Sequence, residues 1–268
     1  MSTDSRQFAG KIAVVTGGTQ GLGEATARLF AERGADGLVI CGRNDERGGR
    51  VAREIATSGC PTTFVEADLA DVDACKRVID AAEDEFGRVD TLINCAGSSE
   101  RGTIETTAPE LWDRVFAINV RAPFFLLQRA VEVMRAQKIA GTIINVITVS
   151  SHGGAPYLVP YAASKGALAT LTRNTANALL RDRIRVNGLN IGWMNTPGEH
   201  AIQKRFHDAP DDWLERAAPN QPFGRLLEPA EVARAIAFLA SDESGMMTGS
   251  VIDFDQTVVG TVPDESRF

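Results

Sequence analysis

A tyrosine and a lysine four residues apart are the pair in this sequence best suited to acid/base chemistry. Tyr161 and Lys165 lie in the segment YAASK, within a helical pattern over residues 160–180, and this spacing places both side chains on one helix face. A free tyrosine has a pKa of about 10, and a nearby ammonium lowers that pKa by stabilising the phenolate. A general acid/base works best with a pKa near the operating pH. We therefore expect Tyr161 to be the catalytic acid/base and Lys165 to lower its pKa.

A glycine-rich turn near the N-terminus predicts a phosphate-binding loop. The segment TGGTQGLG covers residues 16–23, between an apolar run and a helical pattern. Glycines let the backbone turn sharply and approach a ligand, and a helix N-terminus offers free N–H groups to a pyrophosphate. The spacing is GxxxGxG, and the Lys-Ser/Thr of an NTPase P-loop is missing. A plain tight turn is the alternative interpretation.

The elements that must position these groups alternate along the chain. Short β-rich runs alternate with longer helical patterns, which predicts βαβ units and a parallel sheet. The strand runs are apolar on both faces, as expected when helices cover both sides. We expect an α/β fold of the Rossmann type, a doubly wound parallel sheet of seven strands with helices on both faces, in a single domain over residues 1–268. The expected strands cover residues 11–16, 37–41, 62–66, 90–94, 142–147, 184–191 and 250–254, and the expected helices residues 22–33, 45–57, 72–86, 109–137, 160–180 and 229–240.

One irregular stretch and the composition complete this description. Residues 192–228 are rich in Pro and Trp, contain one short helical piece and follow a strand end, which favours a substrate lid.

The net charge of −7 argues against nucleic-acid binding and anionic membranes, and no segment reaches a membrane-spanning length. The N-terminus lacks the apolar core of a secretory signal. Four cysteines without a CxxC pair, beside three histidines, favour reduced thiols in a cytoplasmic protein without a metal site.

Several motifs in order carry a family resemblance. They are TGGTQGLG (16–23), Asp68 in EADL, Asn94-Cys95-Ala96-Gly97, Asn119 in FAINV, Tyr161 with Lys165, and RVNGLNIGWMNT (185–196). From about residue 8 to 256 the chain closely resembles the short-chain dehydrogenase/reductase family. The resemblance implies reversible hydride transfer between a nicotinamide cofactor and a secondary alcohol or ketone.

The same resemblance implies the catalytic residues Asn119, Thr148, Tyr161 and Lys165. Asn119 would hold a water that links Lys165 to solvent, and Lys165 would also bind the nicotinamide ribose. The family usually has a serine thirteen residues before its tyrosine, where this chain has Thr148. The threonine hydroxyl can still hold a substrate oxygen, although its methyl group narrows the pocket. Ser150 and Ser151 are out of register, so we favour Thr148 over Ser150.

The resemblance also implies where the cofactor binds, with Asp68 at the adenine ring and Thr196 at a phosphate or the carboxamide. Two further departures are Ile191-Gly192 in place of Pro-Gly and Asp255-Gln256-Thr257 in place of Asp-Gly-Gly. The expected cofactor-binding residues are Gly17, Thr19, Gln20, Gly21, Leu22, Gly23, Arg43, Asp68, Leu69, Asn94, Ala96, Gly97, Tyr161, Lys165, Gly192, Met194 and Thr196.

The end of the second strand favours NADP(H) over NAD(H). NAD enzymes usually place an acidic residue there to bind the ribose 2′-hydroxyl, whereas this chain has Gly42 followed by Arg43, with no acidic residue before Asp45. The guanidinium of Arg43 would suit a 2′-phosphate. Gln20 argues the other way, because it stands where NADP-preferring relatives often carry a basic residue. NAD(H) therefore stays the alternative.

The substrate is expected to be a small molecule bordered by His152, Tyr157 and Trp193, with Met194, His200 and Trp213 as further pocket candidates. This mixed polar and aromatic lining favours a sugar or polyol. A 3-oxoacyl-type carbonyl reductase is one alternative, and a non-catalytic, cofactor-binding regulatory protein is another. The resemblance further suggests a homotetramer, with residues 229–254 in one interface and the tail 261–268 reaching a neighbour.

Overall fold

The computed structural model describes residues 6–261, and these form one seven-stranded parallel sheet. The strand order is β3-β2-β1-β4-β5-β6-β7, so the order reverses between β1 and β4. This confirms the predicted doubly wound parallel sheet. The strands are β1 (Ile12–Thr16), β2 (Gly37–Gly42), β3 (Thr62–Glu66), β4 (Thr91–Asn94), β5 (Thr142–Thr148), β6 (Arg185–Ile191) and β7 (Val251–Phe254).

Two hydrophobic layers cover the two faces of the sheet. Along β1, Ala13 and Val15 face one layer, whereas Ile12 and Val14 face the other. This alternation follows from the two-residue period of a strand and explains why the strand is apolar throughout. The helices are α1 (Gly21–Glu32), α2 (Asp45–Thr57), α3 (Val72–Phe86), α4 (Pro109–Phe116), α5 (Ala122–Ala136), α6 (Val159–Ala178), α7 (Pro197–His207), α8 (Trp213–Ala217) and α9 (Pro229–Ala240).

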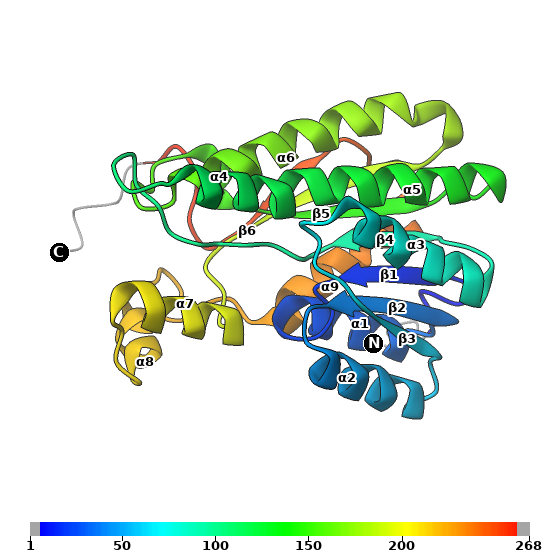
Figure 1. Ribbon diagram of the computed structural model, residues 1–268, viewed down its shortest axis with the longest axis horizontal. Coiled ribbons are helices and arrows are strands. Elements are labelled where there is room, and N and C mark those ends of the chain that lie inside the picture. Colours follow the sequence, from blue (N-terminus) through cyan, green and yellow to red (C-terminus); the bar gives the residue numbers. More distant parts are fainter. Residues whose placement is uncertain (1–5, 262–268) are drawn as a thin grey trace.

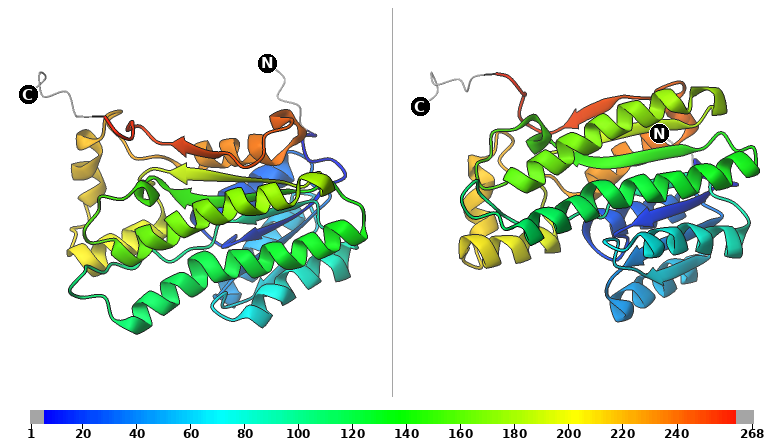
Figure 2. Two further views of the ribbon diagram at one scale, coloured as in Figure 1. Left: turned by 90° about the horizontal axis from the view of Figure 1, so that it is seen from above. Right: turned by 45° about the horizontal axis from the view of Figure 1, so that its top comes forward.

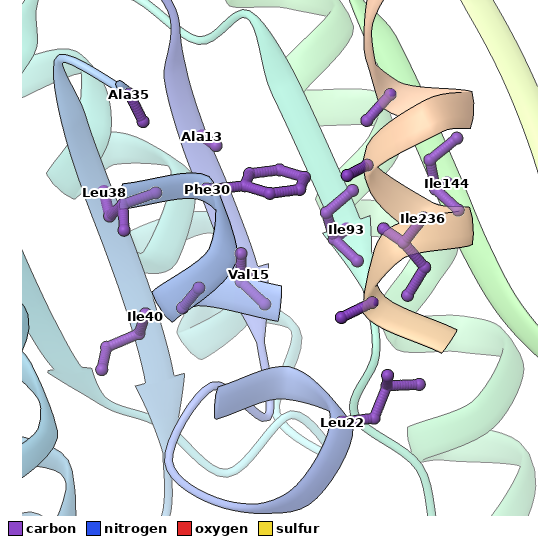
Figure 3. Packing of buried hydrophobic residues seen from close by; sticks show 14 of the residues in the cluster. Ala13, Val15, Leu22, Phe30, Ala35, Leu38, Ile40, Ile93, Ile144 and Ile236 are labelled. Carbon is purple, nitrogen blue, oxygen red and sulfur yellow. The ribbon is translucent and has the colours of Figure 1, made fainter. Parts of the chain in front are cut away.

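The helices divide between the two layers as the sheet requires. Residues of α1, α2 and α9 supply the first layer, and residues of α3, α5 and α6 supply the second; Figure 1 shows α5 and α6 on one side of the sheet and α1 and α9 on the other. In Figure 3, Phe30 of α1 and Ile236 of α9 lie over the strands among Val15, Ile93 and Ile144. Both faces are therefore closed, and the strand ends remain as places for a ligand.

The helix expected over residues 109–137 is interrupted. A π-helical segment, Ala117–Arg121, joins α4 to α5, and the N–H of Ala122 donates to the carbonyl of Ala117, five residues back. Pro123 follows, and because proline has no N–H, the carbonyl of Asn119 lacks its ordinary donor four residues ahead. Such bulges are frequent at functional sites, and Asn119 lies within this one.

The stretch 192–228 is more helical than expected. It holds two helices, α7 and α8, and a short 3₁₀ turn at Ala218–Asn220, rather than one helical piece. Thr196 starts α7 by accepting a hydrogen bond from the N–H of Glu199 at 3.1 Å. Figures 1 and 2 show α7 and α8 at one end of the molecule, apart from the helices that cover the sheet. No helix among residues 6–261 is long and apolar enough to cross a membrane.

Candidate functional site

A cleft of about 1720 Å³ opens at the carboxyl ends of the strands. Its walls come from the glycine-rich turn after β1, the end of β2 and the segments that follow β4, β5 and β6. Ligands of open parallel sheets bind where the strand order reverses, which here lies between β1 and β4. Most of the expected site residues line this one cleft; Asn94, Asn119, His152, His200 and Trp213 do not.

The glycine-rich turn has the shape of a phosphate cradle. Gly17 and Gly21 have positive φ angles of 66° and 56°, which a residue with a Cβ seldom adopts. A Cβ on Gly23 would lie 2.2 Å from the carbonyl oxygen of Gly17, so only glycine lets α1 pack so close to the turn. The N-cap residue Gln20 makes no side-chain capping bond. The first N–H groups of α1 therefore stay available to an anion, and these residues fit the pyrophosphate of a dinucleotide.

Two arginines lie at the adjacent end of β2. Arg43 is exposed and lines the cleft. Arg47, which the sequence interpretation missed, lines it too, and its Nε is buried without a hydrogen-bond partner among the described residues. The backbone N–H of Arg47 donates to the side chain of Asn44 at 2.7 Å, and Asn44 thereby caps α2. A buried cationic N–H without an acceptor is costly, so this rim of the cleft fits an anionic group.

Asp68 closes the same end of the cleft. Its carboxylate accepts a hydrogen bond from the N–H of Ala70 at 3.0 Å and lies 3.5 Å from the guanidinium of Arg114. The hydrogen bond from Ala70 is the largest cause that lowers the pKa of Asp68, with Arg114 and Arg43 adding to it. Asp68 and its neighbour Leu69 both line the cleft, as expected.

The segment after β4 lies between the two ends of the cleft. Ala96 and Gly97 line it, whereas Asn94 is buried and donates to the side chain of Asn145 at 2.8 Å. The side chain of Asn94 thus ties β4 to β5, and Asn94 does not line the cleft, so its expected contact with a cofactor stays a prediction. The N–H groups of Cys95 and Ala96 both donate to the hydroxyl of Thr16 at 3.0 Å, which fixes this turn against β1.

Lys165 lines the cleft but is only 3% exposed. Its ammonium donates to the carbonyl of Val146 at 2.7 Å. Burial lowers the pKa of Lys165 to about 8. A Cβ on Gly97 would lie 3.5 Å from this ammonium, so the turn after β4 packs directly over it.

Tyr161 does not have the lowered pKa that the sequence suggested. Burial is the largest cause and raises the pKa of Tyr161 to about 12, a hydrogen bond with Thr148 lowers it, and nearby Glu199 raises it further. The Lys165 ammonium donates to the carbonyl of Val146 and is not among the groups that lower the pKa of Tyr161, so the effect of burial prevails. The expected direction is therefore wrong for the protein by itself, because burial depends on tertiary packing that the spacing does not show.

Thr148 is placed better than Ser150 to act with Tyr161. Thr148 ends β5, is 7% exposed and lies close enough to the phenol of Tyr161 to lower the Tyr161 pKa. Its hydroxyl also accepts from the N–H of Ser150 at 3.3 Å. Ser151 turns away and donates to Asn190 at 3.3 Å.

Asn119 is fully buried behind the cleft and braces two of its walls. Its side chain accepts from the N–H of Ser98 at 2.8 Å and donates to the Ser98 carbonyl at 2.9 Å. The same amide donates to the hydroxyl of Ser164 at 2.9 Å, and Ser164 in turn donates to the carbonyl of Tyr161 at 2.7 Å. The side chain of Asn119 thus links the turn after β4 to α6, while its backbone carbonyl lacks the usual helical donor.

The segment after β6 bends back over the cofactor end. A Cβ on Gly192 would lie 1.8 Å from the side chain of Asp255, so the residue after β6 must be glycine while Asp255 keeps this place. Thr196 lies beside the glycine-rich turn, because a Cβ on Gly21 would be 3.5 Å from it. Gly192, Met194 and Thr196 all line the cleft as expected.

The structure separates the substrate candidates into three groups. Tyr157, Trp193 and Met194 line the cleft. His152 does not line it and contacts Asp253 of β7 at 2.9 Å, so the structure does not bring His152 together with the other substrate candidates. The remaining candidates support α7 from behind: Trp213 stacks on Trp193 with ring centroids 5.7 Å apart and donates to His200 at 3.0 Å.

The sequence interpretation missed two charged residues at the substrate end. Arg101, from the segment after β4, and Glu199, from α7, line the cleft as an ion pair with a separation of 3.4 Å. Glu199 had a local signal, because Thr196-Pro-Gly-Glu199 has the spacing of a helix-capping motif. Arg101 had no local signal in the sequence, because its partner Glu199 is 98 residues away along the chain.

Comparisons with known proteins agree with this geometry. A family model described as enoyl-(acyl carrier protein) reductase matches residues 17–257. The chain is 36% identical to cis-4-hydroxycyclohexanecarboxylate dehydrogenase of Sinomonas cyclohexanicum, over 92% of this chain and 96% of that protein. It is 33% identical to the NADP-dependent (R)-specific alcohol dehydrogenase of Lentilactobacillus kefiri, over 90% of this chain and 93% of that protein.

A solved structure is similar over almost the whole chain. L-sorbose reductase from Gluconobacter frateurii, in complex with NADPH and L-sorbose, aligns with a TM-score of 0.89 and 30% identity, covering 97% of this chain and 100% of that one. These relatives are oxidoreductases, which does not support the alternative of a non-catalytic regulatory protein. The chain is therefore an NAD(P)-dependent oxidoreductase of the short-chain dehydrogenase/reductase family.

Proposed function

We propose that the chain interconverts a secondary alcohol and a ketone of the sugar or polyol type with NADP(H), using Tyr161 as the acid/base. One observation carries the proposal: Tyr161, Thr148 and Lys165 line the same cleft as the glycine-rich turn. A proton donor, a hydroxyl that can hold an oxygen and an ammonium thus share one cavity with a phosphate cradle.

Each residue has a separate task in this reaction. Bound NADPH supplies the hydride. Tyr161 protonates the carbonyl oxygen during reduction and takes the proton back from the alcohol during oxidation. Thr148 holds the same oxygen by its hydroxyl. Lys165 binds the nicotinamide ribose and steadies the phenolate, and the Asn119 carbonyl holds a water that connects Lys165 to solvent.

The conservative variant Tyr161→Phe tests this assignment. It removes one hydroxyl and keeps the ring that packs in the cleft. General acid/base catalysis contributes about 10²–10⁴-fold, so we expect kcat to fall by about that factor while NADPH still binds. Absorbance at the nicotinamide band measures turnover, and quenching of tryptophan fluorescence measures cofactor binding. Near-wild-type turnover would exclude Tyr161 as the acid/base.

The rim at β2 supports NADP(H). Gly42 offers no acidic side chain for a ribose 2′-hydroxyl, and Arg43 and Arg47 line the cleft beside it. Guanidinium groups match phosphate oxygens in charge and shape. Two similar proteins carry NADP in their descriptions, the alcohol dehydrogenase and the NADPH-bound L-sorbose reductase. The ratio of kcat/KM for NADPH and NADH tests the preference, and a ratio below one would overturn it.

The substrate end supports a sugar or polyol. It is lined by Ser98, Arg101, Thr103, Glu199, Gln203 and His207 beside the aromatic Tyr157 and Trp193. Hydroxyl-rich substrates need many donors and acceptors, whereas an acyl chain needs an apolar channel. The similarity to a 3-oxoacyl-[acyl-carrier-protein] reductase of Thermotoga maritima, which is 34% identical over 93% of this chain and 98% of that protein, supports a 3-oxoacyl-type reductase as the second candidate. A panel of ketoses, polyols, simple ketones and a 3-oxoacyl thioester separates them, and faster reduction of the thioester would favour the second candidate.

The assembly and the compartment are proposals of the same kind. A homotetramer with residues 229–254 in one interface is supported by the family and by Phe238 of α9, which is 41% exposed. A cytoplasmic location is supported by the four cysteines, which are free thiols. Residues 262–268 of the proposed contacting tail lie outside the described residues. Light scattering should give the mass of four chains, and a monomer mass would refute the tetramer.

A further inference from the structure

Glu199 is held in the cleft by three donors. The indole N–H of Trp193 donates to its Oε1 at 2.8 Å, and the amide of Gln203 donates to the same oxygen at 2.7 Å. The guanidinium of Arg101 reaches Oε1 from 3.4 Å. Only 14% of the Glu199 side chain is exposed. These contacts fix the orientation of the carboxylate.

The other oxygen of this carboxylate is left open. All three donors share Oε1, and within residues 6–261 no donor contacts Oε2. Oε2 is also not among the buried polar atoms that lack a partner, so it is accessible. A fixed carboxylate with one saturated oxygen thus presents a single strong acceptor to whatever enters the cleft.

This acceptor lies near the proposed acid/base. Glu199 and Tyr161 line the same cleft, and the charge of Glu199 is close enough to raise the pKa of Tyr161. Glu199 is carried by α7, which starts at Thr196 beside the glycine-rich turn. A substrate whose carbonyl meets Tyr161 therefore brings its neighbouring carbon atoms toward Glu199.

We propose that Oε2 of Glu199 accepts a hydrogen bond from a substrate hydroxyl close to the reacting carbon, and so selects hydroxyketones and polyols over simple ketones and alcohols. The inference rests on the proposed function and narrows its substrate class. Trp193, Gln203 and Arg101 act as positioning residues, because they hold Oε1 and aim Oε2.

The charges at this end argue against a substrate carboxylate. Two arginines at this end, Arg101 and Arg205, line the cleft and could bind one. Arg205 already faces Glu100 at 3.3 Å. The guanidinium of Arg101 already faces Glu199, the Ser99 carbonyl at 2.9 Å and His207 at 3.3 Å. A carboxylate that approached Arg101 would also meet the negative charge of Glu199. A neutral hydroxyl donor meets an acceptor without repulsion.

The variant Glu199→Gln tests the inference with little change in shape. The amide oxygen can still accept from Trp193, Gln203 and Arg101, which leaves an NH₂ group, a donor, where Oε2 was. Glu215→Gln is the matched control, since Glu215 is exposed on α8 and does not line the cleft. The substrates are 1-hydroxybutan-2-one and butan-2-one, which differ by one hydroxyl beside the carbonyl. The measurement is kcat/KM with NADPH for each ketone.

Wild type and the control variant should reduce the hydroxyketone at least about tenfold more efficiently than the simple ketone, because a site built for a hydroxyl rejects the analogue that lacks it. Glu199→Gln should bring this ratio to within about threefold of one. An equal loss for both ketones, with an unchanged ratio, would overturn the inference and leave Glu199 as a support of α7. A wild-type ratio near one, with turnover still dependent on Tyr161, would overturn the inference but keep the proposed function. No reduction of any ketone or ketose by wild type would overturn both.

Discussion

The end of β2 gives a sharp prediction about cofactor choice, because Gly42 lies against Thr19. A Cβ on Gly42 would lie 2.8 Å from Cγ2 and 2.9 Å from Oγ1 of Thr19, but 3.5 Å from its Cβ. Thr19 is itself only 3% exposed, so it has little room to move. Gly42→Asp alone should therefore weaken both cofactors. Adding Thr19→Ala removes the two close atoms and leaves an ordinary contact.

The magnitude follows from charge and hydrogen bonding. Two unit charges about 5 Å apart near a protein surface interact by about 3 kcal/mol, and exposure of this rim to solvent reduces the repulsion to about half. A hydrogen bond from a ribose hydroxyl to the new carboxylate adds about 1.5–3 kcal/mol in favour of NADH. Together these give about 3–4.5 kcal/mol, so the NADPH/NADH ratio should fall by about 10²–10³-fold in the double variant.

The assay is kcat/KM for each cofactor at one saturating ketone concentration. Thr19→Ala by itself is the control, and it should keep the wild-type preference because it adds no charge. The reasoning would be refuted if the double variant kept the NADPH preference. It would also be refuted if Gly42→Asp alone bound NADH as well as the double variant does, because Thr19 would then not obstruct the site.

Two further predictions concern the groups around Tyr161. Thr148→Val should lower kcat by about 10²-fold, as loss of one oxyanion donor does. It should also move the ascending limb of the pH profile for alcohol oxidation to higher pH, because Tyr161 must lose its proton to act as the base and Thr148 lowers the Tyr161 pKa. Thr148→Ser should stay within about threefold of wild type, and a valine variant as active as the serine variant would exclude a role for the hydroxyl. Lys165→Met should abolish turnover yet stabilise the fold at pH 7 by roughly 2–3 kcal/mol, because burial lowers the pKa of Lys165 to about 8. Lys165 binds its proton less tightly in the folded state than in the unfolded state, where a lysine has a pKa near 10.4. The charged lysine therefore destabilises the folded wild-type protein fully below about pH 8, and this loss of stability disappears as the pH rises from about 8 to about 10.4. Thermal unfolding of wild type and Lys165→Met at pH 7 and pH 10 measures the difference in their stability. A difference that grows toward pH 10 would contradict the predicted pH dependence.

The strands and the cofactor end were readable from the sequence because their signals are local. The apolar run before TGGTQGLG predicts β1 to within one residue, and the glycine spacing predicts the turn. The pair Tyr161 and Lys165 shares one helix, so its place depends on a four-residue spacing alone. Each of these features is fixed by neighbours along the chain.

The substrate end was not readable because its contacts join distant segments. Arg101 and Glu199 meet only after α7 folds back over the cleft. His152 was expected at the substrate from its place between Thr148 and Tyr161, but Asn190 and Asp253 hold it at 3.1 Å and 2.9 Å outside the cleft. The predicted lowering of the Tyr161 pKa was wrong for the same reason, because the burial that raises this pKa results from the whole fold.

The π-helical segment between α4 and α5 has a geometric consequence for the whole helix pair. A regular α-helix advances by about 100° per residue about its axis, whereas the wide turn takes up its extra residue without turning α5 by a further 100°. Leu126 and Met134 of α5 are buried in the core, while the side chain of Asn119, inside the wide turn, contacts Ser98 and Ser164. A deletion of one residue between 117 and 121 would restore a regular helix and leave α5 in the core, but it would remove the turn that carries Asn119. The support behind the cleft can therefore be altered without unpacking the helix that covers the sheet.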